Sequence, residues 1–262
     1  MEFFATAGNI PMHIRDSKKG DKAIILLHGY METMYIWNEL YDNLKNDYRV
    51  ILIDLPGHGL SCSAPINTMD FIAIAVKGVL DVCGVEKAYI GGHSLGGYAA
   101  FSCCKTFPST FLGLILFNSH PYPEDPDFAV NREREISIIR SGRLMTLAEV
   151  SLPKMYFSEN LRKCDDKIRE TLELCDTHDP EGIIACIKGM VQRPDNSDFM
   201  KNPSLPILVV LGDNDGFISM DLIEQMQLEF PKVKIEIIPS CGHNCFIEKP
   251  QEALFLVKAF LG

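Results

Sequence analysis

The sequence lacks any apolar run long enough to cross a membrane. Its longest apolar segments, such as Phe111–Phe117 and Leu205–Leu211, fall far short of the ~20 residues that a spanning helix needs. The N-terminal segment also lacks a basic start and a continuous apolar centre, since no Lys or Arg precedes Arg15. It is therefore not expected to be a signal peptide, and no insertion into a membrane is expected.

Positive charge is also scarce. The chain has 25 Lys and Arg residues against 35 Asp and Glu, which gives a formal net charge of −10. Nucleic acids and anionic membrane surfaces attract clustered positive charge, so neither is expected as a partner. The nine cysteines are odd in number and scattered through a chain long enough to form its own core. We therefore expect reduced thiols and a cytoplasmic location.

What the sequence does contain is a regular alternation of short apolar segments with longer segments of helical period. Apolar strands separated by helices are typical of an α/β fold, a mostly parallel central sheet flanked by helices on both faces. An opening β-hairpin is expected from Glu2–Thr6 and Ile10–Arg15. The other expected strands are Lys22–Leu27, Arg49–Ile53, Lys87–Ile90, Leu112–Phe117, Ile207–Leu211 and Val233–Ile238, and the expected helices are Met34–Leu44, Asp70–Cys83, Leu95–Phe107, Asp221–Phe230 and Pro250–Leu261.

Residues 121–201 depart from this alternation. Prolines break the chain at its start, and the stretches that follow have helical period without a strand candidate. We expect a helical insertion there, and a core domain of residues 1–120 and 202–262. Arg132, Ile136, Ile139 and Arg143 would share one face of a helix. The arginines fit either a solvated face or a contact to a substrate carboxylate.

The strongest chemical signal is Gly92-His93-Ser94-Leu95-Gly96, between an expected strand and an expected helix. Its glycines allow a sharp turn in which side chains would not fit. Such a turn exposes the Ser94 hydroxyl at the N-terminus of a helix, where the dipole favours developing negative charge. A glycine-rich turn that only packs helix against strand is the structural alternative.

A serine hydroxyl needs a base, and the base needs an acid to orient it. His243 follows the strand Val233–Ile238, at the carboxyl edge of the sheet, where sites in open α/β folds form. Asp213 and Asp215 follow the strand Ile207–Leu211 at the same edge. Spacing alone does not choose between them, so we expect one to cap the turn and the other to hold His243.

A tetrahedral oxyanion needs two fixed donors. The backbone N–H groups of Tyr30 and Leu95 could supply them, since Tyr30 lies in the segment Leu27-His28-Gly29-Tyr30 directly after a strand. His28 is interpreted as a structural histidine. Met31, His120 and Phe217 are candidates for the substrate pocket. Met34 and Trp37 are expected near this site as well.

These motifs and their order along the chain resemble the α/β-hydrolase fold superfamily, as does Asp54-Leu55-Pro56-Gly57-His58-Gly59. The resemblance implies a serine hydrolase with a helical cap inserted after the sixth strand. It places the catalytic acid at Asp215, with Asp213 as the alternative. Some relatives carry an acid after the sixth strand, but this chain has Asn118-Ser119-His120 there.

The expected function is hydrolysis of a small carboxylic ester, thioester or lactone through Ser94, His243 and Asp215. No cofactor or metal is expected, and the oligomeric state is open. The rate should rise with pH between roughly 6 and 7, as the base loses its proton. The resemblance leaves open a carbon–carbon bond hydrolase, a lyase, a cofactor-free haloperoxidase or a ligand-binding protein without turnover.

Overall fold

The structure, a computed structural model, describes all 262 residues except for the side chain of Asp127. Eight strands form one sheet in the order β1-β2-β4-β3-β5-β6-β7-β8. Strands β1 and β2 form an antiparallel hairpin, β2 pairs antiparallel with β4, and all other pairs are parallel. The strands are β1 (Glu2–Ala7), β2 (Ile10–Asp16), β3 (Ala23–Leu27), β4 (Arg49–Ile53), β5 (Ala88–His93), β6 (Phe111–Phe117), β7 (Ile207–Gly212) and β8 (Lys234–Ile238).

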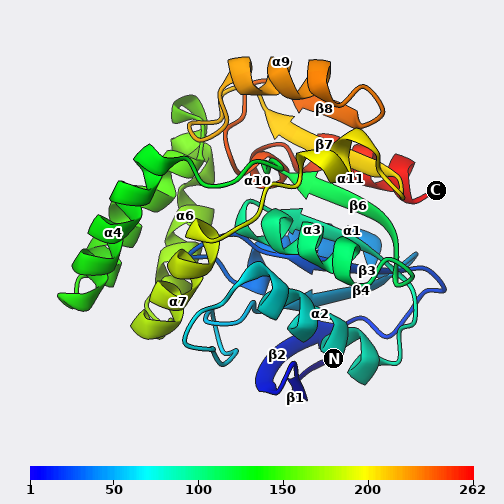
Figure 1. The fold of residues 1–262 in the computed structure, drawn as a ribbon, viewed down its shortest axis with the longest axis horizontal. Coiled ribbons are helices and arrows are strands. Elements are labelled where there is room, and N and C mark those ends of the chain that lie inside the picture. The colour runs from blue at the N-terminus through cyan, green and yellow to red at the C-terminus, as the bar shows by residue number, and fades with distance from the viewer.

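Helices cover both faces of the sheet and bury two separate hydrophobic cores (Figure 1). In β3, Ile25 and Leu27 face one core while Ile24 and Leu26 face the other, because side chains alternate along a strand. Helices α2 (Met69–Cys83), α3 (Leu95–Thr106) and α9 (Met220–Glu229) pack on the first face, and α1 (Asn38–Leu44), α10 (Cys245–Glu248) and α11 (Pro250–Leu261) pack on the second.

The expected α/β architecture is therefore confirmed, with small differences in its elements. The expected helix Met34–Leu44 consists of the 3₁₀ turn η1 (Met34–Trp37) followed by α1. Strand β5 continues through Gly91 and Gly92, which pair with Leu26 and Leu27. A Cβ at Gly91 would lie 2.6 Å from the Leu26 side chain, so glycine permits the close approach there.

The segment between β6 and β7, which we call the cap, is helical and lies at one end of the sheet (Figure 1). Its helix α4 buries Ile136 and Ile139. The expectation that Arg143 shares this face is wrong, because α4 ends at Arg140 and Gly142 turns the chain with φ +76°. The cap elements are α4 (Pro126–Arg140), α5 (Leu144–Ser151), η2 (Leu152–Met155), η3 (Ser158–Asn160), α6 (Leu161–Cys175), α7 (Pro180–Val191) and α8 (Ser197–Lys201). Across the described residues, every helix is too short or too polar to cross a bilayer.

Candidate active site

Ser94 lies in a sharp turn between β5 and α3. Its backbone has φ 49° and ψ −113°, a strained conformation for a residue with a side chain. A Cβ at Gly92 would lie 2.3 Å from the carbonyl oxygen of Gly96, and a Cβ at Gly96 would lie 2.3 Å from that of Leu27. Neither position can hold a side chain, which explains the glycine spacing of the motif.

His243 and Asp215 meet at the carboxyl edge of the sheet. The Nδ1 atom of His243 lies 2.8 Å from Oδ2 of Asp215, which follows β7. The other carboxylate oxygen accepts the N–H groups of Phe217 at 2.7 Å and Ile218 at 3.2 Å. Burial raises the pKa of Asp215, but the charge of His243 and these hydrogen bonds outweigh it and hold the pKa below its usual range. The ionised carboxylate therefore keeps a hydrogen on Nδ1, which leaves Nε2 as an acceptor.

The neighbouring Asp213 has a different partner. Its Oδ1 atom accepts the N–H of Cys241 at 3.3 Å, so it supports the turn that precedes His243. Asn118, at the end of β6, donates to Oδ2 of Asp215 at 2.8 Å and to the carbonyl of Gly242 at 3.1 Å. The sequence indicated only that position 118 lacks an acid. In the structure its amide orients the acid that follows β7.

Tyr30 and Leu95 carry the two backbone N–H groups that are expected to bind an oxyanion. Tyr30 follows β3, and Leu95 is the first residue of α3. Neither N–H donates to another group among the described residues, as expected for the first turn of a helix in the case of Leu95. Met31, with φ +61°, donates its own N–H to Nε2 of His58 at 3.2 Å. That bond fixes the loop that carries Tyr30.

His28 lies beneath this loop and makes two local hydrogen bonds. Its Nδ1 donates to the carbonyl of Gly29 at 2.8 Å, and its Nε2 accepts the N–H of Leu55 at 2.9 Å. Burial lowers its pKa, so the ring is neutral at neutral pH. These contacts fit the structural role that the sequence indicated.

A cavity of about 320 Å³ joins these groups. Ser94 and His243 lie on its wall, together with the three candidate pocket residues Met31, His120 and Phe217. The ring of Phe217 lies 4.8 Å from that of His243, measured between centroids. The volume falls at the lower end of the range for small-molecule sites. The cap contributes Phe128, Asn131, Arg132, Glu135, Ser151, Leu152, Lys154, Met155 and Met190.

His120 is held as a neutral hydrogen-bonding group. Burial, followed by the charges of Arg193 and His243, lowers its pKa to about 3. Its Nε2 lies 3.3 Å from the Tyr98 hydroxyl, and its Nδ1 accepts the N–H of Tyr122 at 3.3 Å. His120 therefore offers no charge to a ligand near neutral pH.

Met34 and Trp37 do not line the cavity, contrary to expectation. Both are fully buried in the second core, on the opposite side of the sheet from α2 and α3. Trp37 stacks on Phe246 with ring centroids 4.2 Å apart. The 3₁₀ turn η1 directs these side chains toward α10 rather than toward Ser94.

The cap side of the cavity has polar groups with open bonding capacity. Arg132 forms ion pairs with Glu135 at 3.0 Å and, through Nε, with Glu124 at 3.5 Å, and its guanidinium lies 5.6 Å from the centre of the Tyr30 ring. The Tyr30 hydroxyl and Nε of Arg132 are buried without a hydrogen-bond partner among the described side chains. The exposed Lys154 also lines the cavity, and no carboxylate of a described side chain lies within 4 Å of its ammonium.

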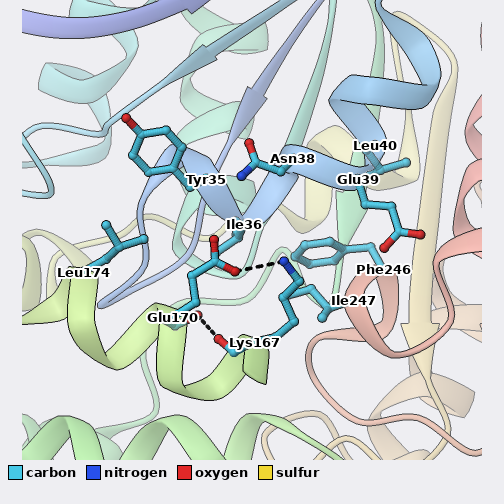
Figure 2. Close-up of a pocket in the computed structure, with 11 residues that line it drawn as sticks. Tyr35, Ile36, Asn38, Glu39, Leu40, Lys167, Glu170, Leu174, Phe246 and Ile247 are labelled. Atoms are coloured by element: carbon cyan, nitrogen blue, oxygen red, sulfur yellow. Dashed lines mark hydrogen bonds and ion pairs between the residues drawn. The ribbon is translucent and has the colours of Figure 1, made fainter. Parts of the chain in front are cut away.

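A second hollow lies between α6 of the cap and the core segments η1, α1 and α10 (Figure 2). Tyr35 and Phe246 contribute to it from the core, and Lys167 and Glu170 form an ion pair at 2.9 Å on the cap side. Its volume is about 30 Å³. A space of this size accommodates a few water molecules at most, so it is not a substrate site.

The loop that carries His243 is hydrogen-bonded to the cap. The N–H of Asn244 donates to the carbonyl of Met155 at 3.0 Å. The buried carboxylate of Glu248 accepts the N–H of Gly242 at 2.7 Å and that of Phe157 in the cap at 3.1 Å. The sequence analysis did not identify Glu248, because its role depends on which cap segment folds onto the loop.

Comparisons with known proteins agree with this geometry. The sequence model of the alpha/beta hydrolase fold matches residues 22–250. A 2-hydroxy-6-oxononadienedioate/2-hydroxy-6-oxononatrienedioate hydrolase of Paraburkholderia phymatum is 26% identical over 96% of this chain and 91% of its own length. A pimeloyl-acyl-carrier-protein methyl ester esterase of Nitrosomonas europaea is 24% identical over 92% of this chain and 96% of its own length.

The solved structure of a thermophilic esterase from Thermogutta terrifontis is also similar. It superposes with a TM-score of 0.92 at 27% identity and covers 100% of this chain and 98% of its own. The family match spans most of the sequence, the sheet has the order and direction described above, and these relatives are hydrolases and esterases. The chain is therefore an enzyme of the α/β hydrolase fold family.

Proposed function

We propose that this enzyme is a serine hydrolase that cleaves a small carboxylic ester, thioester or lactone through an acyl-enzyme. The observation that carries the proposal is the hydrogen bond between Asp215 and His243, whose imidazole lines the same cavity as the strained Ser94. The esterases among the relatives support the reaction type.

In the proposed reaction His243 Nε2 accepts the hydroxyl proton of Ser94 as the oxygen attacks the substrate carbonyl. Asp215 stabilises the imidazolium, and the N–H groups of Tyr30 and Leu95 bind the oxyanion. Collapse of the tetrahedral intermediate expels the alcohol or thiol, which takes the proton from His243. A water molecule that His243 deprotonates then attacks the acyl-enzyme, and a second collapse releases the carboxylic acid and restores Ser94.

We assign substrate selection to the cap, residues 121–201. Lys154 and the unpartnered hydroxyl of Tyr30 favour an acyl group that carries a second acceptor, such as a carboxylate, at its far end. Two relatives support this preference, since one is named for a dioate and the other for a pimeloyl ester. A half-ester of a dicarboxylic acid should therefore give a higher kcat/KM than a neutral ester of equal length. Lys154→Met should reduce that preference.

The test of the nucleophile is intact-mass analysis after exposure to a fluorophosphonate. The wild-type chain should gain one adduct, and Ser94→Ala should gain none. Ser151→Ala is the matched control, because Ser151 is a second hydroxyl on the cavity wall and should leave labelling unchanged. If folded wild-type protein gains no adduct, the proposal fails and a ligand-binding role replaces it.

Carbon–carbon bond hydrolysis is the second candidate, favoured by the relatives that cleave 2-hydroxy-6-oxononadienedioate. The same triad would serve, but the leaving group would be a carbanion equivalent that needs a proton on carbon. A vinylogous 1,3-diketone acid and an ester of equal size separate the two. Turnover of the diketone alone would assign carbon–carbon cleavage, and turnover of the ester alone would assign esterase activity.

A further inference from the structure

A second buried acid–histidine pair lies behind the wall of the cavity. Glu32, in the loop after β3, and His93, at the end of β5, are 1% and 0% exposed. Neither side chain lines the cavity. Oε2 of Glu32 accepts the N–H of Gly29 at 2.7 Å and lies 2.8 Å from Nδ1 of His93. The other ring nitrogen of His93 lies 3.0 Å from the backbone carbonyl oxygen of His243.

The number of protons in this pair follows from its partners. The carbonyl of His243 can only accept, so Nε2 of His93 must donate. Oε2 of Glu32 already accepts from Gly29, and an ionised carboxylate has no hydrogen, so Nδ1 must donate as well. A neutral imidazole has a single N–H, so with Glu32 ionised the two bonds together require His93 to be an imidazolium. In agreement, burial raises the pKa of Glu32, but the charge and hydrogen bond of His93 hold it below its usual range.

The hydrogen bonds of this pair connect three segments that carry groups of the proposed reaction. Gly29 precedes Tyr30, which carries one oxyanion donor, and His93 precedes Ser94. The third bond reaches the backbone of the base itself. We propose that Glu32 and His93 are positioning residues, a buried ion pair that fixes the oxyanion loop and the base loop relative to Ser94. This inference rests on the proposed serine hydrolase function.

Glu32→Gln should disrupt these hydrogen bonds while keeping the size and shape of the side chain. The position of Oε2 would be taken either by the amide oxygen or by the amide NH₂ group. An oxygen retains the bond from Gly29 but no longer supplies the negative charge that holds a second proton on His93. An NH₂ group can donate to a neutral His93 but faces the N–H of Gly29. Either orientation therefore releases one of two loops: the oxyanion loop, which the carboxylate binds at Gly29, or the base loop, which it holds through His93.

The kinetic test compares Glu32→Gln with wild type and with His13→Asn. His13 is 2% exposed and bonded to Asp54 at 2.8 Å, so it is also part of a buried acid–histidine pair, and neither residue of that pair lines the cavity. Glu32→Gln should lower kcat about 10- to 100-fold and change KM by less than about threefold, since oxyanion and base alignment act in the transition state. His13→Asn should lower Tm and leave kcat near wild type. A wild-type kcat in Glu32→Gln would overturn the proposal.

A double-mutant cycle tests whether the two residues act as one unit. His93→Asn and the double variant with Glu32→Gln should lose a similar factor in kcat, because removing either residue removes the same pair. If kcat of the double variant fell by the product of the two single-variant factors, a shared role would be contradicted.

The proton count has its own test in ¹⁵N-histidine spectra of the wild-type protein. His93 should show both ring nitrogens protonated in the folded enzyme. His13 also has hydrogen-bond partners at both ring nitrogens, in its case two carboxylates, and His13→Asn identifies its signal. A singly protonated His93 would refute the ion pair. Failure of fluorophosphonate labelling with a doubly protonated His93 would instead refute the serine hydrolase function and leave the pair in place.

Discussion

At the scale of single residues, the carboxylate of Asp215 determines which nitrogen of His243 carries the proton. Asp215→Asn should lower kcat by about 10³- to 10⁴-fold, because an amide can donate to Nδ1 and so place the hydrogen on Nε2, facing Ser94. Steady-state kinetics on an activated ester measure this loss. The retained oxygen of the amide can still accept from Phe217 and Ile218, but the new NH₂ group would face the Asn118 amide that now donates to Oδ2, so Tm should also fall.

Asp213→Asn is the matched control for this prediction. Asp213 lies two positions away in the same turn and accepts a backbone N–H rather than the imidazole. Its variant should retain kcat within a fewfold. A larger loss in Asp213→Asn than in Asp215→Asn would exchange the roles of the two aspartates.

The residues that the sequence identified are those whose chemistry is set by their immediate neighbours. Ser94 and His243 stand at recognisable junctions of strand and loop, so their position could be predicted from local pattern. Asn118, Glu32 and Glu248 could not be found this way, because each has a hydrogen-bond partner in a segment distant in the sequence. The acid Glu32 follows an apolar strand, but nothing local indicates that His93 is its partner.

At the scale of elements, the Asp16–Arg49 pair joins β2 to β4. Asp16 is fully buried, and Arg49 contacts it through Nε at 3.1 Å and Nη2 at 2.7 Å. Nη2 also donates to the carbonyl of Cys83, at the end of α2. Burial acts to raise the pKa of Asp16, but the hydrogen bonds from Arg49 and Lys18 prevail and lower it to about 2.

This shift predicts a pH dependence of stability. A carboxyl whose pKa is lowered by folding stabilises the protein above its unfolded pKa, and the contribution disappears as pH falls through the folded value. The Asp16 contribution, about 2 kcal/mol, should therefore be present above pH ~4 and lost toward pH ~2. Asp16→Asn should lower the free energy of unfolding near neutral pH and flatten this part of its pH dependence, measured by urea unfolding.

The exposed pair Lys77–Asp81 provides the comparison for that experiment. Asp81 is 62% exposed, and the pair lies on the outer face of α2. Asp81→Asn should change the free energy of unfolding by less than about 0.5 kcal/mol at any pH. If Asp16→Asn and Asp81→Asn changed the free energy of unfolding equally, burial would not increase the stabilisation that the Asp16–Arg49 pair provides.

The elements themselves could be predicted well because their apolar pattern is strong. Strand β4 has the bounds that its sequence indicated, since Val50, Ile51, Leu52 and Ile53 are buried on alternate faces. The short helix α10 was not found, because a four-residue helix has no period to detect. Its formation depends on Phe246, which packs against Trp37 from a distant part of the chain.

At the scale of the whole molecule, the cap and the base loop share the carboxylate of Glu248. Glu248→Gln should disturb both, because an amide places a donor among the N–H groups of Gly242 and Phe157. We expect a loss of about 1–3 kcal/mol in the free energy of unfolding. A lower kcat should accompany it, since His243 adjoins Gly242.

Thermal unfolding and ester kinetics on the same preparations check this prediction. Glu252→Gln, at an exposed position of α11, is the control and should leave both quantities unchanged. If Glu248→Gln lowered Tm without lowering kcat, the hydrogen bonds to the cap would support stability alone.

The position of the cap between β6 and β7 also has a consequence for the order in which the enzyme is made. Ser94, Tyr30 and Leu95 belong to the part of the chain that is synthesised before the cap, whereas Asp215 and His243 follow it. A nascent chain thus exposes the edge of β6 until β7 arrives to pair with it. Until then it holds a serine without a base, so the proposed hydrolytic activity can arise only after the last strands have emerged from the ribosome.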